Sequence, residues 1–361
     1  MNSNNKTVVS IAVLVGLITL AVYSGSLTCG FINMDDPFYI TNNLLIRNLD
    51  LQTLRRLFTE AHLGAWIPLT HVSFAIDHHF WGSDPTGYHL TNIVLHALNA
   101  TMVVLLTDRL LKNERKWIAG DIGNFLYPVM LLLAGLMWGI HPLRVESVAW
   151  AAERKDVLNG LLTLAAVISY IRYVQLKEAG KRRMLLVPYL LALLFFVLSL
   201  LAKQVSVTLP VILLLLDWYP LARFRKKKLV SLLVEKIPFL VIALLIAFMT
   251  IYIAAEGKIL SSIVDFPFYV RVLVSGNAIF EYCRLSFFPT GINPYIVIPK
   301  PLPYGYLVKT ITVAAISLFM LRISQRKPAI AAVWFAFIVL LLPTLAFIQA
   351  GDDIAMAARY T

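Results

Sequence analysis

Leu185–Ala202 reads LLVPYLLALLFFVLSLLA, a stretch without a charged side chain. A helix that crosses the hydrocarbon of a bilayer needs about 20 mostly apolar residues, so this stretch predicts a transmembrane helix. Similar stretches recur along the 361 residues. They give about nine candidate spans: Val8–Ser24, Tyr88–Thr107, Phe125–Ile140, Val157–Val174, Leu185–Ala202, Val205–Trp218, Ile237–Ala255, Tyr306–Leu321 and Ala329–Ile348. We therefore expect an all-α polytopic membrane protein, with residues 1–361 forming a single transmembrane domain.

The composition supports this assignment. Hydrophobic residues make up 59% of the chain and charged residues 14%, whereas a soluble protein has about a quarter of its residues charged. A soluble enzyme is therefore excluded. The two cysteines, Cys29 and Cys283, are too few for a disulfide framework or a cysteine-based zinc site.

The net charge of the chain is +12. We interpret this excess of basic residues as a signal of membrane orientation and not of nucleic-acid binding. Four basic clusters lie between spans, at Arg109–Lys116, Arg172–Arg183, Arg223–Lys236 and Arg322–Lys327. The positive-inside rule places these clusters and the N-terminus in the cytoplasm, against anionic headgroups of membrane lipids. We expect a multi-pass protein of the bacterial inner membrane, or of the endoplasmic reticulum if the source is eukaryotic. No nucleic-acid partner is expected.

This orientation leaves two long non-cytoplasmic loops, 26–87 and 256–305. Loops of that length in a compact protein usually carry function. In the first loop, Leu49–Phe58 and Trp66–Phe80 have the spacing of short helices. In the second, the stretch 266–288 carries Arg271, Glu281 and Arg284. This charge content favours an interfacial or re-entrant helix over a further span.

An acidic pair, Asp35-Asp36, lies just outside the first span. Adjacent carboxylates repel one another, so one of them can acquire a raised pKa and act as a general base. The alternative interpretation is a turn, since Asn33 and Pro37 flank the pair and all of these residue types favour turns.

A second polar segment, His141–Asp156, places six charges between two spans. Its Arg154 and Lys155, together with Lys203 in the turn after Ala202, are candidates to hold a lipid phosphate, the arginine as a planar fork and the lysines as point charges. Salt bridging within the segment and snorkelling to water are the competing interpretations.

Aromatic and histidine side chains offer further candidates. Trp66 suits either interfacial anchoring or sugar stacking. The histidines at 71, 78 and 79 lack any recognised metal-ligand spacing, so no protein metal site is expected. A divalent ion, Mg²⁺ or Mn²⁺, bridging a donor phosphate to the acidic pair stays an open alternative.

Several segments resemble one known family in their order along the chain. They are Asn33–Asn42 (NMDDPFYITN), Trp66–Ser73 (WIPLTHVS), Gly87–Asn99 (GYHLTNIVLHALN), His141–Leu158 (HPLRVESVAWAAERKDVL) and Lys203–Leu221 (KQVSVTLPVILLLLDWYPL). The chain resembles membrane glycosyltransferases of the GT-C type, and in particular the transmembrane and tetratricopeptide-repeat-containing O-mannosyltransferases and their bacterial relatives.

The resemblance implies an inverting transferase. Its members move a sugar from a polyprenyl- or dolichyl-phosphate carrier to an acceptor on the non-cytoplasmic side, often a protein Ser or Thr hydroxyl and otherwise a glycan. By position, Asp35 and Asp36 match the catalytic acidic pair. Arg154, Lys155 and Lys203 fall where the carrier phosphate would be held. Trp66, His141 and Glu146 are further candidates to contact the sugar or the acceptor. No cofactor is required.

The chain departs from the family pattern near residue 358. Family members read roughly ADRYTYLP there, whereas this chain has Ala358 in place of the aspartate and ends at Thr361. The family's further spans and repeat domain are absent, so we expect an amino-terminal portion of such an enzyme. Two other classes stay open: a transporter or flippase of a lipid-linked sugar, and a truncated non-catalytic relative.

Overall fold

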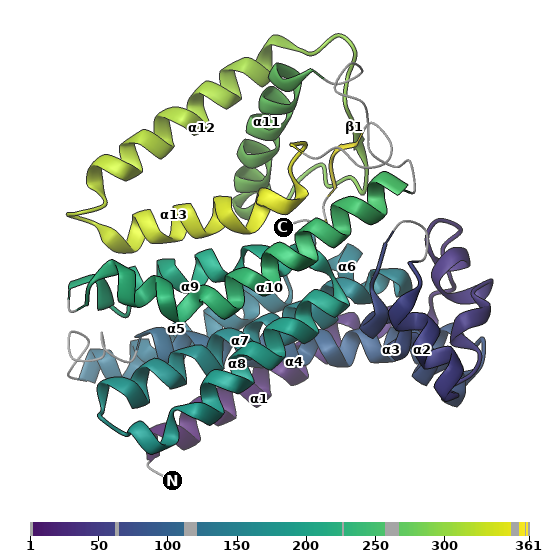
Figure 1. Ribbon diagram of the computed structural model, residues 1–361, viewed down its shortest axis with the longest axis horizontal. Coiled ribbons are helices and arrows are strands. Elements are labelled where there is room, and N and C mark those ends of the chain that lie inside the picture. Colours follow the sequence, from purple (N-terminus) through teal and green to yellow (C-terminus); the bar gives the residue numbers. More distant parts are fainter. Residues whose placement is uncertain are drawn as a thin grey trace. The chain divides into compact units, whose positions relative to one another are not determined.

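The computed structural model describes residues 3–61, 65–111, 121–225, 227–256, 267–347, 354–357 and 359. These residues are almost entirely helical, which confirms the all-α class (Figure 1). The chain separates into two compact units: unit 1 is Met1–Glu60 with Ile67–Lys203, and unit 2 is Ala61–Trp66 with Gln204–Thr361.

Within the described residues, six helical segments are long and apolar enough to cross a membrane. They are Asn5–Thr28, Pro85–Leu111, Ala151–Glu178, Arg182–Ala202, Leu229–Glu256 and Tyr304–Ile323. A bent pair, Phe125–Gly139 with Pro142–Ala149, would be a seventh. The chain is therefore a multi-pass membrane protein. The remaining two predicted spans correspond to shorter apolar helices, Gln204–Trp218 and Pro328–Thr344.

The α-helices of unit 1 are α1 (Ser3–Tyr23), α2 (Leu51–Thr59), α3 (Pro68–Trp81), α4 (Pro85–Leu111), α5 (Asp121–Gly139), α6 (Val145–Ala149), α7 (Arg154–Glu178) and α8 (Leu186–Ala202). Two 3-10 turns, Pro142–Arg144 and Ala151–Glu153, precede α6 and α7 respectively. The two short helices expected in the first loop are confirmed as α2 and α3. Asp50 starts α2 by accepting the N–H of Thr53 at 2.7 Å, which satisfies a donor that the helix leaves open.

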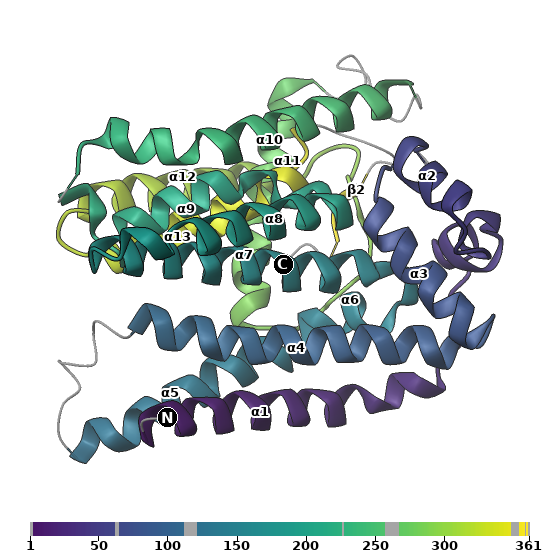
Figure 2. The same ribbon diagram turned by 60° about the horizontal axis from the view of Figure 1, so that its bottom comes forward.

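Helices α1, α4 and α5 pack closely, as Figure 2 shows. Small residues allow this approach, as is usual between membrane helices. A Cβ on Gly135 would lie 2.5 Å from the side chain of Val104 and 2.9 Å from that of Val15. Helices α7 and α8 form a second close pair, which brings the start of α7 beside the end of α8.

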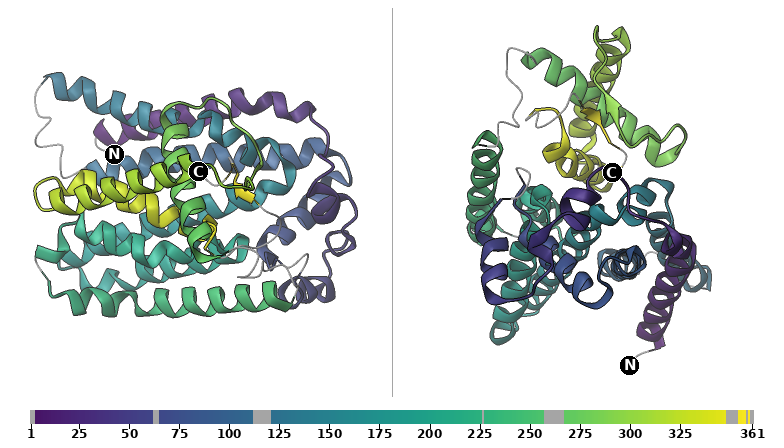
Figure 3. Two further views of the ribbon diagram at one scale, coloured as in Figure 1. Left: turned by 90° about the horizontal axis from the view of Figure 1, so that it is seen from above. Right: turned by 90° about the vertical axis from the view of Figure 1, so that its right-hand side faces the viewer.

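Unit 2 contains α9 (Leu209–Trp218), α10 (Leu229–Glu256), α11 (Phe268–Phe287), α12 (Tyr304–Ile323) and α13 (Pro328–Leu341). Helix α10 is the long green helix at the bottom of the left view in Figure 3. Helix α13 stops at Leu341 because Pro343 follows, and a proline ring cannot continue the helical hydrogen bonds. The apolar sequence is thus longer than the helix that it forms.

A buried group of charges joins the end of α9 to the start of α10. Arg223 donates to Asp217 at 2.9 Å and to Glu235 at 2.8 Å, and Lys236 contacts Asp217. Arg223, Lys236 and Asp217 have no exposed surface. The sequence assigned Arg223–Lys236 as a whole to a cytoplasmic basic cluster. The structure buries two of those cations because carboxylates nearby in the chain neutralise them.

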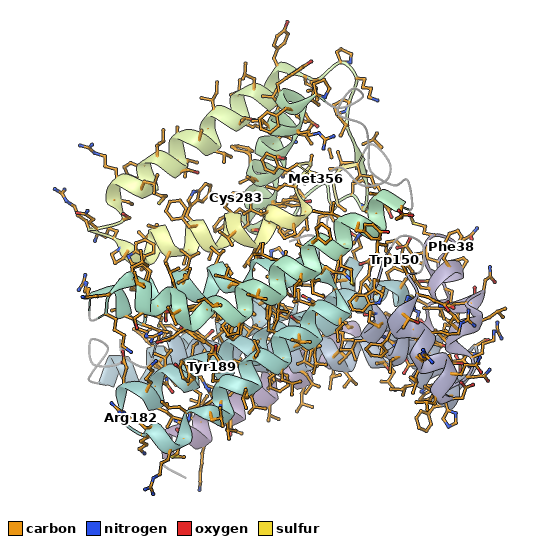
Figure 4. All side chains as sticks on the ribbon, in the orientation of Figure 1. Phe38, Trp150, Arg182, Tyr189, Cys283 and Met356 are labelled. Atoms are coloured by element: carbon orange, nitrogen blue, oxygen red, sulfur yellow. The ribbon has the colours of Figure 1, made fainter. Side chains whose placement is uncertain are left out.

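Helices α11 and α12 also pack together, through Lys309 on α12. Its Nζ lies 2.6 Å from Glu281 and 3.1 Å from Asn277, both on α11. The C-terminal strand β2 (Ile354–Met356) pairs antiparallel with β1 (Ile296–Val297). Figure 4 labels Cys283 on α11 and Met356 on β2. Both cysteines of the chain are free thiols.

Candidate functional site

The two acidic residues of the pair lie in different surroundings, and Asp36 is the buried one. It has no exposed surface. Its Oδ2 accepts the N–H of Ile32 at 2.7 Å, and its Oδ1 accepts the N–H of Ala152 at 2.8 Å. Burial raises the pKa of Asp36, and these hydrogen bonds partly counter the rise. Asp36 therefore fastens the first loop to the turn before α7.

Asp35 is accessible. A third of its side chain is exposed (33%), and its Oδ2 lies 3.3 Å from the Nζ of Lys155. Its main-chain carbonyl accepts the N–H groups of Phe38 and Tyr39, each at 3.0 Å, so the predicted turn is present as well. Phe38 and Trp150 mark the two segments that this region joins (Figure 4). The turn presents Asp35 outward while Asp36 points inward.

Asp35 belongs to a larger cluster of charges in unit 1. The carboxylate–lysine cluster consists of Asp35, Glu153, Lys155, Asp156 and Lys203. Lys155 lies 3.1 Å from Glu153, and Lys203 lies 3.8 Å from Glu153 and contacts Asp156. Three carboxylates and two lysines give a formal charge of −3 + 2 = −1. The structure therefore brings together three of the residues that the sequence singled out, Asp35, Lys155 and Lys203.

The pairing of α7 with α8 assembles this cluster. Glu153 precedes α7, Lys155 and Asp156 lie in its first turn, and Lys203 directly follows α8. Asn159 holds the two ends in register, because its Nδ2 donates to the carbonyls of Ser199 and Lys203, both at 2.8 Å. The Nζ of Lys155 also lies over the ring of Tyr39, 4.9 Å from its centre.

Arg154 points away from the cluster into the interior. Its guanidinium has no exposed surface and pairs with Asp77 at 2.5 Å. The same group donates to Asn92 at 2.8 Å, to the carbonyl of Tyr88 at 2.8 Å and to that of Ser73 at 3.2 Å. These contacts hold α3 and α4 against α7. The sequence assigned Arg154 to a lipid phosphate, and in this structure its donors are buried and occupied by these contacts.

The sequence alone did not single out Asp77 or Asn92. Asp77 is the ion-pair partner of Arg154, and it lies outside the segment His141–Asp156 within which salt bridging was the competing interpretation. The available signal was an isolated acid in the apolar run of α3, since an acid in such a run is costly unless it is paired. Asn92 also links α4 to the segment before α7, because its Nδ2 donates to the carbonyl of Trp150 at 3.1 Å.

Three further candidates make contacts of other kinds. His141 caps the turn before α6, where its Nδ1 accepts the N–H of Leu143 at 3.2 Å. Glu146 is half-buried in the first turn of α6. Trp66 belongs to unit 2, and its carbonyl accepts a hydrogen bond from the side chain of Gln204. None of these contacts joins them to the carboxylate–lysine cluster.

No group of three or more His, Cys, Asp or Glu side chains in the described ranges is placed to hold a metal ion. Of the seven histidines, His62 and its neighbours lie outside those ranges, and so does Ala358. Arg359 is described, and its guanidinium lies over the ring of Tyr295, 5.0 Å from the centre.

Several known proteins that resemble this chain are named protein O-mannosyl-transferases. Protein O-mannosyl-transferase Tmtc1 of Drosophila melanogaster is 30% identical over 198 residues, which are 53% of this chain and 21% of that protein. TMTC3 of Homo sapiens is 26% identical over 175 residues, 46% of this chain and 17% of that protein. TMTC4 of Mus musculus is 27% identical over 177 residues, 46% of this chain and 23% of that protein.

The matches thus cover about half of this chain and about a fifth of each relative. No protein-family model matches the chain, and no solved structure matches it. The resemblance drawn from the ordered sequence motifs is confirmed: over about half its length, the chain is a relative of the TMTC protein O-mannosyl-transferases.

Proposed function

We propose that this chain is the membrane portion of a GT-C type glycosyltransferase. It moves a sugar from a polyprenyl- or dolichyl-phosphate carrier to a hydroxyl of a protein acceptor, on the non-cytoplasmic side and with inversion. One observation carries the proposal: Asp35 presents a partly exposed carboxylate, held by Lys155, within a cluster of charges at the start of α7. The similarity to protein O-mannosyl-transferases supports this reaction class.

Asp35 acts as the general base. A Ser or Thr hydroxyl is a weak nucleophile and needs a positioned base. As the hydroxyl oxygen attacks the anomeric carbon, its proton passes to the Asp35 carboxylate. The bond between the anomeric carbon and the phosphate oxygen breaks, and the lipid phosphate leaves with that electron pair. A single displacement of this kind inverts the anomeric centre.

Lys155 and Lys203 stabilise the leaving phosphate. Cationic groups placed where charge develops lower the barrier most in a site that is shielded from water. Both side chains are mostly buried, with 12% and 17% of their surface exposed. Each already pairs with a carboxylate, so each moves part of its contact from Glu153 or Asp156 to the phosphate as the donor binds.

The test is sugar transfer by the native-length protein from a polyprenyl-phosphate donor to an acceptor peptide. We expect Asp35→Asn to lower the rate at least 100-fold, the scale of a lost general base. Asp84→Asn is the matched control, because Asp84 is exposed in the same loop and accepts hydrogen bonds from Thr86. Unchanged transfer by Asp35→Asn would refute the assigned base.

Two arms of the same assay separate the neighbouring possibilities. Chelation with EDTA and readdition of Mg²⁺ or Mn²⁺ tests whether a divalent ion bridges the donor phosphate, and we expect transfer to continue under chelation. Movement of the lipid-linked sugar across the vesicle membrane without any covalent product would instead indicate a transporter.

The proposed orientation has its own test. Cys29 is a free, exposed thiol at the start of the first loop. If the N-terminus is cytoplasmic, a membrane-impermeant maleimide should label Cys29 in intact cells of a Cys283→Ser variant. Labelling only after permeabilisation would reverse the topology.

A further inference from the structure

Arg144 is a cation that the proposed reaction has not used. It ends the 3-10 turn Pro142–Arg144, and its guanidinium lies over the ring of Trp138, 5.1 Å from the centre. Among the described residues, its side chain forms no hydrogen bond or ion pair, and its Nε is buried without a partner. An arginine that is half-buried in this state lacks the anion that its planar fork of donors is built to hold.

A second polar side chain that the proposed reaction does not use lies near Arg144. Tyr23, the last residue of α1, is buried, and its hydroxyl has no hydrogen-bond partner in the described part of the chain. The ring of Tyr23 meets His96 edge-on at 5.1 Å, and His96 stacks on Trp138 at 5.1 Å. The chain Tyr23, His96, Trp138 and Arg144 is therefore continuous.

His96 already has a hydrogen-bond partner, so Tyr23 and Arg144 are the donors to consider for a ligand. Its Nε2 lies 2.7 Å from the carbonyl of Gly139, and this contact holds the imidazole ring in place. The phenol of Tyr23 and the guanidinium of Arg144 are close enough to interact electrostatically. Two hydrogen-bond donors without partners therefore lie among the same aromatic side chains. This arrangement indicates a position at which one acceptor binds both donors.

The balance of charge identifies the kind of acceptor. The neighbouring cations have acidic partners: Asp77 for Arg154, Glu153 for Lys155 and Asp156 for Lys203. Arg144 interacts with Asp156 only at longer range, while the second oxygen of Asp156 accepts a hydrogen bond from Ser147 at 3.2 Å. An anion bound beside the carboxylate–lysine cluster, which already carries −1, needs a further cation, and Arg144 supplies it.

We propose that Arg144 and the Tyr23 hydroxyl bind the phosphate group of the lipid-linked substrate. The identity of the lipid rests on the proposed function, whereas the two donors and the anion do not. Arg144 forms paired hydrogen bonds to two phosphate oxygens, and Tyr23 donates one more. In this arrangement Arg144 anchors the phosphate, and Lys155 and Lys203 engage the oxygen that leaves.

Binding to the full chain in lipid nanodiscs tests the site. The probe is a fluorescent polyprenyl phosphate, followed by anisotropy. We expect Arg144→Gln to raise its Kd at least 10-fold, Tyr23→Phe to raise it about 3-fold, and Arg144→Lys to give an intermediate value, because a point charge replaces the fork. Arg182→Gln is the matched control, since Arg182 is exposed in the turn before α8, and its Kd should not change.

Competition distinguishes the sources of phosphate. Unlabelled polyprenyl phosphate should displace the probe at micromolar concentration, with inorganic phosphate required at 100-fold higher concentration or more. Equal displacement by phosphatidylglycerol would overturn the assignment to a carrier lipid. An unchanged Kd in both Arg144→Gln and Tyr23→Phe would overturn the site itself.

The binding experiment can fail or succeed independently of the proposed function. If no donor supports transfer but probe binding depends on Arg144, the transferase proposal fails and the phosphate site stands. If transfer proceeds and Arg144→Gln binds the probe as well as the wild type does, the site fails alone. Should Arg144→Gln not fold, as judged by its Tm, Tyr23→Phe decides, because it removes only the hydroxyl.

Discussion

The backbone N–H of Ala152 donates a 2.8 Å hydrogen bond to the carboxylate of Asp36, across 116 residues of sequence. Because Lys155 follows three residues after Ala152, this bond also sets the distance between Asp35 and Lys155. The two acids of the pair thus have different surroundings: Asp36 is buried and hydrogen-bonded, and the partly exposed Asp35 is the one that we propose as the base. This difference predicts that replacing them will have different consequences.

Asp36→Ala should lower stability and transfer together, whereas Asp35→Asn should lower transfer alone. Removal of the Asp36 carboxylate leaves the N–H groups of Ile32 and Ala152 without an acceptor. Each unsatisfied buried group costs about 1–3 kcal/mol. Thermal unfolding in detergent measures the first effect and initial rates the second. Equal Tm values for the two variants would contradict this difference between the two acids.

Asp36 should also give stability a dependence on pH. Burial raises its pKa in the folded protein. A carboxyl of this kind contributes stability that is fully present below its unfolded pKa and is lost as pH rises through the folded pKa. The Tm of the wild type minus that of Asp36→Asn should therefore increase as the pH is lowered from neutral toward the ordinary pKa of an aspartyl side chain, about 4. A difference that shrinks on acidification would contradict the sign of the shift.

Arg154→Met should destabilise unit 1 by about 3–5 kcal/mol, the usual result of removing one partner of a buried ion pair. The reason is that Asp77 would keep its charge in the interior. The double variant Arg154→Met with Asp77→Asn should recover part of the loss, since neither charge is then left alone. Arg182→Met is an exposed control. The measurement is unfolding by denaturant, and a neutral Arg154→Met would exclude the packing role.

Gly276→Ala should weaken the contact between α11 and α12. A Cβ at this position would overlap the side chain of Thr310, so the helices would have to separate. Overpacking of this kind costs about 1–3 kcal/mol. Gly305→Ala on α12 is the matched control, because nothing lies within 4 Å of its Cβ position. Limited proteolysis of the loop between the helices, with Tm, reports the effect; equal behaviour of the two variants would contradict it.

The sequence predicted most of the helices because the bilayer imposes a simple rule of length and apolarity. Leu185–Ala202 and the spans like it follow that rule directly. The rule did not predict the end of α13, because Pro343 ends that helix although the apolar sequence continues. Composition also does not show that Asp217 neutralises Arg223 and Lys236 within the basic cluster Arg223–Lys236.

The site was predictable in part for the same kind of reason. Asp35, Lys155 and Lys203 were recognisable as charges near span ends, where they are costly unless used. Their neighbours Arg154 and Arg144 were not separable by type, because both are arginines in one short segment. Only the fold shows that Arg154 meets Asp77 and that Arg144 meets an aromatic ring instead.

The pairing of Arg154 with Asp77 also has a consequence for biosynthesis. A ribosome makes Asp77 long before Arg154, so α3 is synthesised while the ion-pair partner of its buried acid in the described chain is still to come. Helices α3 and α4 therefore cannot reach their final packing until α7 has been inserted. Nascent chains released before residue 154 would carry Asp77 without this partner.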